Sequence, residues 1–95
     1  DNRYVKVAGL VLLRQRPSTA KGITFVTLED EVGTMNLVLR QHIWERYYSI
    51  ARRSNAWLVH GTLENRNRVQ HVVVHRLEDL SSHLGNLEPK SRDFR

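Results

Sequence analysis

A cluster of three carboxylates in this sequence has the chemistry for acid–base catalysis or metal binding. Glu29, Asp30 and Glu31 are consecutive in TLEDEVG. Consecutive residues at a strand end point in alternating directions, so these three carboxylates cannot all converge on one metal ion. The stretch from Asp30 to Gly33 has the composition of a tight turn in which Asp accepts hydrogen bonds from the backbone. We therefore expect a structural turn here.

The histidines do not combine into a metal site either. His71 and His75 have the same parity but lie about 13 Å apart along a strand that rises about 3.3 Å per residue. His60 and His71 could be cross-strand neighbours, for which a surface pair is the expected role. Ser18 and Thr19 have no evident base, and the sequence contains no cysteine for a thiolate site. The sequence predicts neither catalysis nor a cofactor in this chain.

Length and charge narrow the classes of function. With 95 residues the chain is enough for one small domain. Fifteen Lys and Arg residues against ten Asp and Glu give a net charge of +5, which favours a polyanionic partner. No apolar stretch approaches the roughly 18 residues of a membrane span, so we expect a soluble protein with no membrane partner. The chain begins at Asp1 without an initiator Met, which suggests a piece of a longer protein.

Hydrophobic periodicity predicts five strands and one helix. Gly9 is a natural bend in the first strand, and Ile43, Tyr47 and Ile50 recur at helical spacing in the helix. The expected strands are residues 4–16, 23–29, 34–39, 55–63 and 69–77, with the helix at 41–53 and turns at 30–33 and 64–68. Because the sequence becomes polar after Leu80, we expect a folded domain at 1–80 and a disordered tail at 81–95.

This order of elements predicts an all-β fold, a five-stranded antiparallel Greek-key barrel with one helix between the third and fourth strands. Closure removes the exposed strand edges, and the helix plugs one open end. This is the oligonucleotide- and oligosaccharide-binding (OB) architecture. Another small α+β sheet is the alternative.

In such a barrel the ligand face comes from the second and third strands and is framed by two loops. If Val26 and Leu28 are core, strand alternation turns Phe25 outward, where it either stacks on a base of a single-stranded nucleic acid or packs under the first loop. The loop cations would contact phosphates, or else form a solvated rim. The candidate binding residues are Arg14, Arg16 and Lys21 in the first loop, Arg66 and Arg68 in the second, and Phe25, Thr27, Asn36 and Val38 on the outer face.

Four segments of the sequence carry a resemblance to one particular family of domains. They are VAGLVLLRQRPSTAKGITFVTLEDEVGTMNLVL, WERY, LVHGTLENRNRVQHVVVHRLEDL and the ending SRDFR. The sequence is similar to the C-terminal nucleic-acid-binding domain of bacterial C-family DNA polymerases, in particular the error-prone paralogues of the DNA polymerase III α subunit. The broader outline is shared with anticodon domains of class II aminoacyl-tRNA synthetases. In those domains an aromatic residue on the second strand stacks on a base, and a polar residue after the following turn recognises a base. Phe25 and Asn36 occupy the matching positions. Thr24 departs from the family pattern, since an aliphatic residue is usual there.

The resemblance implies a partner and a setting. The complete polymerase would extend primers across damaged template in the bacterial cytoplasm, with accessory mutagenesis proteins and the sliding clamp. Its catalytic carboxylates would belong to a palm domain outside this chain. This domain would bind the single-stranded template DNA, and in isolation we expect a monomer.

Two other binding functions remain open. The first is a tRNA anticodon-binding module, in which Phe25 and Asn36 would read bases. The second is a protein-interaction barrel with an exposed aromatic patch of Trp44, Tyr47, Tyr48 and Trp57, residues for which core and helix packing is the alternative role.

Overall fold

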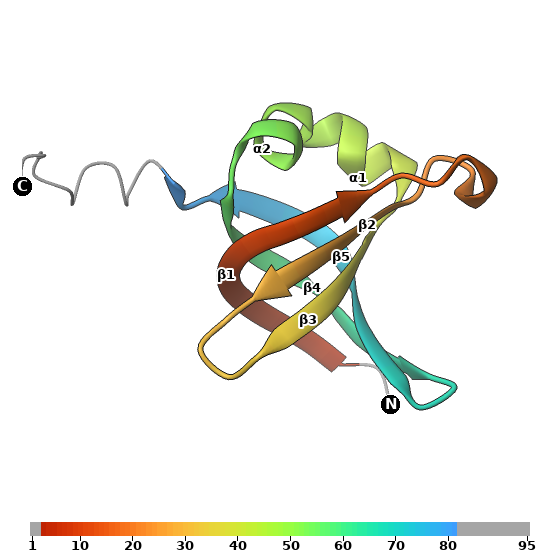
Figure 1. Cartoon of the computed structure of the whole chain (residues 1–95), viewed down its shortest axis with the longest axis vertical. Helices are drawn as coiled ribbons and strands as arrows, with labels where there is room; N and C mark the ends of the chain where they lie inside the picture. The colour runs from red at the N-terminus through yellow and green to blue at the C-terminus, as the bar shows by residue number, and fades with distance from the viewer. Residues whose placement is uncertain (1–2, 82–95) are drawn as a thin grey trace, which may run out of the picture.

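Five strands close into a barrel, and two short helices cover one end of it (Figure 1). The structure is a computed structural model that describes residues 3–81. The strand order around the barrel is β1-β2-β3-β5-β4. The elements are β1 (Arg3–Gln15), the 3-10 helix η1 (Ser18–Ala20), β2 (Thr24–Glu29), β3 (Thr34–Leu39), α1 (Gln41–Arg46), α2 (Tyr48–Arg53), β4 (Ala56–Arg66) and β5 (Val69–Asp79). The expected all-β barrel is confirmed.

The barrel is not antiparallel throughout. Four neighbouring pairs run antiparallel, whereas β3 and β5 pair in parallel through Asn36 with His71, Leu37 with Val72 and Val38 with Val73. A closed ring with an odd number of strands must contain at least one parallel pair, because directions cannot alternate all the way round. The parallel pairing closes the barrel and places β5 beside β3, next to the outer face of β2 and β3.

The long first strand serves both sides of the barrel because it bends. Its residues up to Leu10 pair with β4, and those from Leu10 onward pair with β2. A Cβ atom at Gly9 would lie 2.3 Å from the carbonyl oxygen of Glu29, so only glycine allows this close approach. Between Val11 and Leu13 the register shifts by one residue, and this bulge reverses the parity of the strand beyond it.

The core follows the alternation expected on β2 and β3. Val26 and Leu28 are buried on β2 and are matched by Leu37 and Leu39 on β3. Trp57 on β4 is fully buried, and its indole N–H donates to the Ser54 carbonyl oxygen over 3.1 Å. The other fully or nearly fully buried apolar residues are Ile43, Ala51, Ala56, Val59, Val72, Val73, Val74 and Leu77.

The expected single helix over 41–53 is two helices. Tyr47 breaks it, with φ −110° and ψ 30°, although the segment contains neither Pro nor Gly. Ile43 from α1 and Ala51 from α2 are buried against the barrel. Trp44 and Tyr47 are half-buried, Tyr48 is exposed and Trp57 is in the core. The exposed patch of four aromatic residues therefore does not form.

Within residues 3–81 none of the helices has the length and apolar character needed to cross a membrane. All but Ser81 of the expected tail at 81–95 lies outside the described residues.

Candidate functional site

A pocket of about 540 Å³ lies on the outer face of β2 and β3 and extends to the ends of β1 and β5. Its lining is mostly apolar, with a few hydroxyl, amide and imidazole groups among the aliphatic side chains. The lining residues are Leu13, Gln15, Ile23, Phe25, Val26, Thr27, Asn36, Leu37, Val38, Val69 and His71. Four of the candidate residues from the sequence meet here: Phe25, Thr27, Asn36 and Val38.

The strand register places these four residues side by side. Phe25 is the direct cross-strand partner of Val38, and Thr27 is the partner of Asn36. The Phe25 side chain is 40% exposed, while its neighbours in the chain, Thr24 and Val26, are buried at 0% and 2%. The expected outward orientation of Phe25 is confirmed, whereas its contact with a base stays a prediction.

The pocket also includes Leu13 and His71, which were not among the candidate binding residues. Across the sheet, Leu13, Thr27, Asn36 and His71 form one continuous row of neighbouring strand positions. The His71 Nε2 atom lies 3.5 Å from a carboxylate oxygen of Glu64, the cross-strand partner of His71 on β4. The parallel pairing of β3 with β5 brings His71 beside Asn36, and no local sequence signal indicates that pairing.

The structure does not bring Arg14 to the pocket. Arg14 belongs to β1 and not to the following loop, and the bulge at Leu12 turns its side chain to the core-facing side opposite Val26. Its Nε donates to the Ala51 carbonyl over 2.8 Å, and its Nη2 donates to the Ser54 carbonyl. Burial lowers the pKa of the Arg14 guanidinium from its ordinary value. Arg14 therefore binds the C-terminal end of α2.

Arg16 is also held by the chain itself. Its Nη1 donates to the Thr24 hydroxyl over 2.9 Å, and its Nη2 donates to the Gln41 side-chain oxygen over 3.2 Å. The guanidinium carbon lies 4.7 Å from the centre of the Trp44 ring. These contacts explain why Thr24 occupies a buried position where an aliphatic residue was expected, since its hydroxyl has a charged donor as partner.

Of the other predicted cations, Lys21 and Arg68 lie close in sequence to residues that line the pocket. Lys21 is exposed, with φ 51°, two residues before pocket-lining Ile23. Arg68 is exposed in the β4–β5 turn, with φ 67°, directly before pocket-lining Val69. The backbone of Arg66 ends β4, and its side chain lies outside the description.

The acidic run after β2 is the expected turn. A carboxylate oxygen of Asp30 accepts hydrogen bonds from the backbone N–H groups of Val32, over 2.8 Å, and Gly33, over 2.9 Å. The Asp30 N–H also donates to the Gly33 carbonyl over 2.8 Å. The prediction of a structural role for Asp30 is confirmed.

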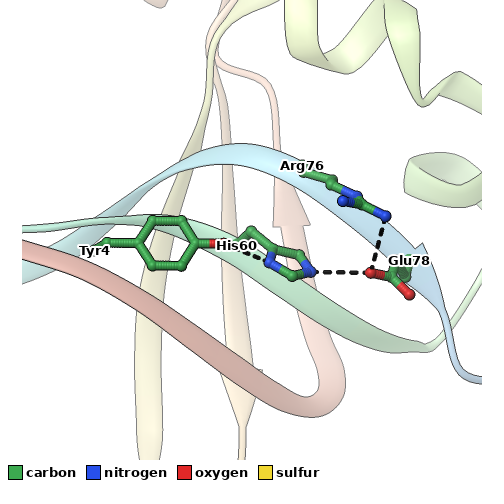
Figure 2. Close-up of polar contacts among 4 residues, drawn as sticks. All are labelled: Tyr4, His60, Arg76 and Glu78. Carbon is green, nitrogen blue, oxygen red and sulfur yellow. Dashed lines mark hydrogen bonds and ion pairs between the residues drawn. The ribbon is translucent and has the colours of Figure 1, made fainter.

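A polar chain of four residues lies on the outer face of β1, β4 and β5, away from the pocket (Figure 2). His60 Nδ1 lies 2.6 Å from the Tyr4 hydroxyl and His60 Nε2 lies 2.9 Å from the Glu78 carboxylate, which Arg76 also approaches at 3.4 Å. The hydrogen bond to His60 lowers the pKa of Glu78 from its ordinary value. His60 is thus paired across β4 and β5 with Arg76 and not with His71, which corrects the expected neighbourhood of the two histidines.

Among residues 3–81 no three His, Cys, Asp or Glu side chains gather in a way that could hold a metal ion. The polar chain of Figure 2 connects three strands by hydrogen bonds and by the Arg76–Glu78 ion pair.

Comparison with known proteins agrees with the fold and with the predicted resemblance. The family model of the OB-fold nucleic acid binding domain matches residues 5–80. The chain is 60% identical over 95 residues to the error-prone DNA polymerase of Rhodopirellula baltica, covering 100% of this chain and 8% of that protein. It is 49% identical over 94 residues to the error-prone DNA polymerase of Pseudomonas syringae pv. tomato, covering 99% of this chain and 9% of that protein. The chain thus spans less than a tenth of the length of these curated relatives.

A solved structure shares the fold at low sequence identity. Asparaginyl-tRNA synthetase from Pyrococcus horikoshii superposes with a TM-score of 0.69 at 20% identity, over 82% of this chain and 20% of that chain. At this identity the likeness concerns the fold alone. The family match covers most of the sequence, and the chain therefore belongs to the family of OB-fold nucleic-acid-binding domains.

Proposed function

We propose that the pocket on β2 and β3 binds a short stretch of single-stranded template DNA, as a module of an error-prone bacterial DNA polymerase. The observation that carries this proposal is the outward Phe25, an exposed aromatic ring in a mostly apolar pocket with Thr27 and Asn36 beside it. Exposed aromatic rings on such a sheet are typical stacking platforms for single-stranded nucleic acids.

The proposed contacts follow from the side chains present. A base stacks on Phe25, with Val38 as its apolar neighbour across the strands. The Thr27 hydroxyl and the Asn36 amide offer both donors and acceptors to base edges. Because stacking tolerates any base, we expect weak sequence preference.

The phosphates of the bound strand contact the cations at the two ends of the pocket, Lys21 before β2 and Arg68 in the β4–β5 turn, with Arg66 as a further candidate. Binding should therefore weaken as salt rises. Arg14 and Arg16 support this site indirectly. Their guanidinium groups donate hydrogen bonds to the helices and to Thr24.

The high identity to error-prone DNA polymerases supports the wider setting. We propose that residues 1–80 act as the folded unit and that 81–95 form a tail. The complete polymerase would replicate damaged template DNA in the cytoplasm, in contact with the sliding clamp and accessory mutagenesis proteins. The template-binding domain would hold the unpaired strand near a catalytic centre located elsewhere in that polymerase.

The proposal is tested by fluorescence titration of the domain with single-stranded DNA, duplex DNA and tRNA. Phe25→Ala should weaken single-strand binding about 5- to 150-fold, because a stacked base contributes about 1–3 kcal/mol. Phe25→Tyr, which keeps a ring, should retain most of the affinity. Val32→Ala is the matched control, since Val32 is 95% exposed on the turn after β2 and outside the pocket.

Circular dichroism of each variant confirms that the fold is intact. Unchanged single-strand affinity in folded Phe25→Ala would refute the stacking site. Much tighter binding of one tRNA than of single-stranded DNA would instead establish an anticodon-reading domain. Undetectable oligonucleotide binding at low salt, with tight binding to a polymerase segment, would establish a protein-interaction module.

A further inference from the structure

A second group of exposed positive charges lies on the helices, outside the loops that frame the pocket. The segment from residue 40 to residue 53 contains four arginines and one acidic residue, Glu45, so it contributes +3 of the chain's net +5. All four arginines, Arg40, Arg46, Arg52 and Arg53, are exposed. None of them makes an ion pair with another residue in the described range 3–81.

Two of these arginines are held in place by aromatic rings. The guanidinium carbon of Arg46 lies 5.8 Å from the centre of the Tyr47 ring, and that of Arg52 lies 5.7 Å from the centre of the Tyr48 ring. Stacking on a ring restrains the long side chain while its N–H groups stay available. A guanidinium with free donors suits phosphate oxygens, which it can bind in bidentate fashion. The single acid, Glu45, accepts a hydrogen bond from the Gln41 side-chain amide over 2.6 Å.

The helix surface adjoins the β1–β2 loop, which lies at one end of the pocket and includes residues Arg16 to Gly22. Gln41, the first residue of α1, accepts a hydrogen bond from Arg16 on the incoming side of that loop. A Cβ atom at Gly22, on its outgoing side, would lie 2.3 Å from the Gln41 side-chain oxygen, so the two segments are in close contact. Figure 1 shows α1 beginning next to this loop, while the β2–β3 turn with Glu29, Asp30 and Glu31 lies at the other end of the strands.

We infer that the nucleic acid strand leaving the pocket continues over α1 and α2, where its phosphates contact Arg46 and Arg52 with Arg40 and Arg53 nearby. This inference rests on the function proposed above. The acidic turn repels phosphates at the opposite end of β2 and β3, so electrostatics favours the path over the helices. The helices thus extend the binding site beyond the bases that the pocket holds.

The length of the oligonucleotide separates the two parts of the site. OB folds cover about 4 to 16 nucleotides, so an oligothymidylate of about 4 nucleotides reports on the pocket, and one of about 16 reaches the helices. Their affinities are measured by fluorescence anisotropy over a range of salt concentrations. The test variant is Arg46→Ala combined with Arg52→Ala. The matched control is Lys6→Ala combined with Arg76→Ala, which removes the same charge from residues outside the pocket and the helices.

For the longer oligonucleotide, the helix variant should lower the slope of log affinity against log salt by about 1.4, since each lost single-strand phosphate contact removes about 0.7. The affinity of the short oligonucleotide should stay unchanged in that variant. An unchanged slope in the helix variant, or an equal fall in the control variant, would overturn the inference. The proposed pocket is tested separately. If Phe25→Ala does not weaken binding of the short oligonucleotide, the pocket is refuted whatever the helix variant shows.

Discussion

Arg14→Met is the change that most sharply separates a structural role from a binding role. In the structure Arg14 Nε donates to the Ala51 carbonyl over 2.8 Å and Nη2 donates to the Ser54 carbonyl. The last carbonyls of a helix have no partner within the helix, and a cation there also interacts favourably with the helix dipole. Methionine keeps much of the packing volume beside Trp57, over whose ring the guanidinium lies at 5.7 Å, but it has no donor to offer.

The expected loss of stability is large for a domain of this size. Hydrogen bonds to a charged group contribute about 1.5–3 kcal/mol each, and water partly replaces them at this half-buried site. We therefore expect Arg14→Met to lower the free energy of unfolding by about 2–4 kcal/mol, out of a typical total of about 5–15 kcal/mol. At about 4–8 °C per kcal/mol, the melting temperature should fall by roughly 8–32 °C.

Thermal unfolding followed by circular dichroism measures this loss. Arg46→Met is the control, because Arg46 is exposed on α1 and makes a cation–π contact with Tyr47 but no hydrogen bond or ion pair with another residue between 3 and 81. Its melting temperature should stay within about 4 °C of the parent chain, as for most surface changes. A melting temperature of Arg14→Met equal to that of the parent, together with weakened oligonucleotide binding, would refute the structural role.

Two further predictions concern the bend and the polar chain. Gly9→Ala should cost about 1–3 kcal/mol, because its Cβ would lie 2.3 Å from the Glu29 carbonyl oxygen, whereas Gly33→Ala meets nothing within 4 Å; urea unfolding compares the two, and equal midpoints would contradict the close approach. The hydrogen bond to His60 depresses the pKa of Glu78, so its stabilising contribution is present above pH 4.5, the ordinary pKa, and is lost as pH falls through the depressed value. The melting temperature of the parent chain should therefore fall more steeply below pH 4.5 than that of Glu78→Gln, and parallel curves would exclude this linkage.

Strand alternation in the sequence was sufficient to predict the pocket's central face. On β2 and β3 the inward and outward positions alternate with no bulge, so burying Val26 and Leu37 necessarily turned Phe25 and Val38 outward. The turn between the strands was equally local, since Asp30 caps it with its own side chain. These features depend on neighbours in the sequence and on one hairpin.

The features that alternation missed depend on irregularities and on distant pairing. One extra residue at the bulge in β1 reversed the side to which Arg14 points, and bulges leave no reliable mark in an apolar run such as VLL. His71 joined the pocket only because β5 lies parallel to β3. The break at Tyr47 has no Pro or Gly to mark it. In each case the deciding contacts are tertiary.

The most direct test of the central claim is an amide chemical-shift titration of the isotopically labelled domain with a single-stranded oligonucleotide of about 16 bases. The account predicts that the largest changes occur at Phe25, Thr27, Asn36, Val38 and His71, the outward residues of the pocket. Changes that leave these five amides unaffected and concentrate instead around Tyr4, His60 and Glu78, on the other outer face (Figure 2), would contradict it.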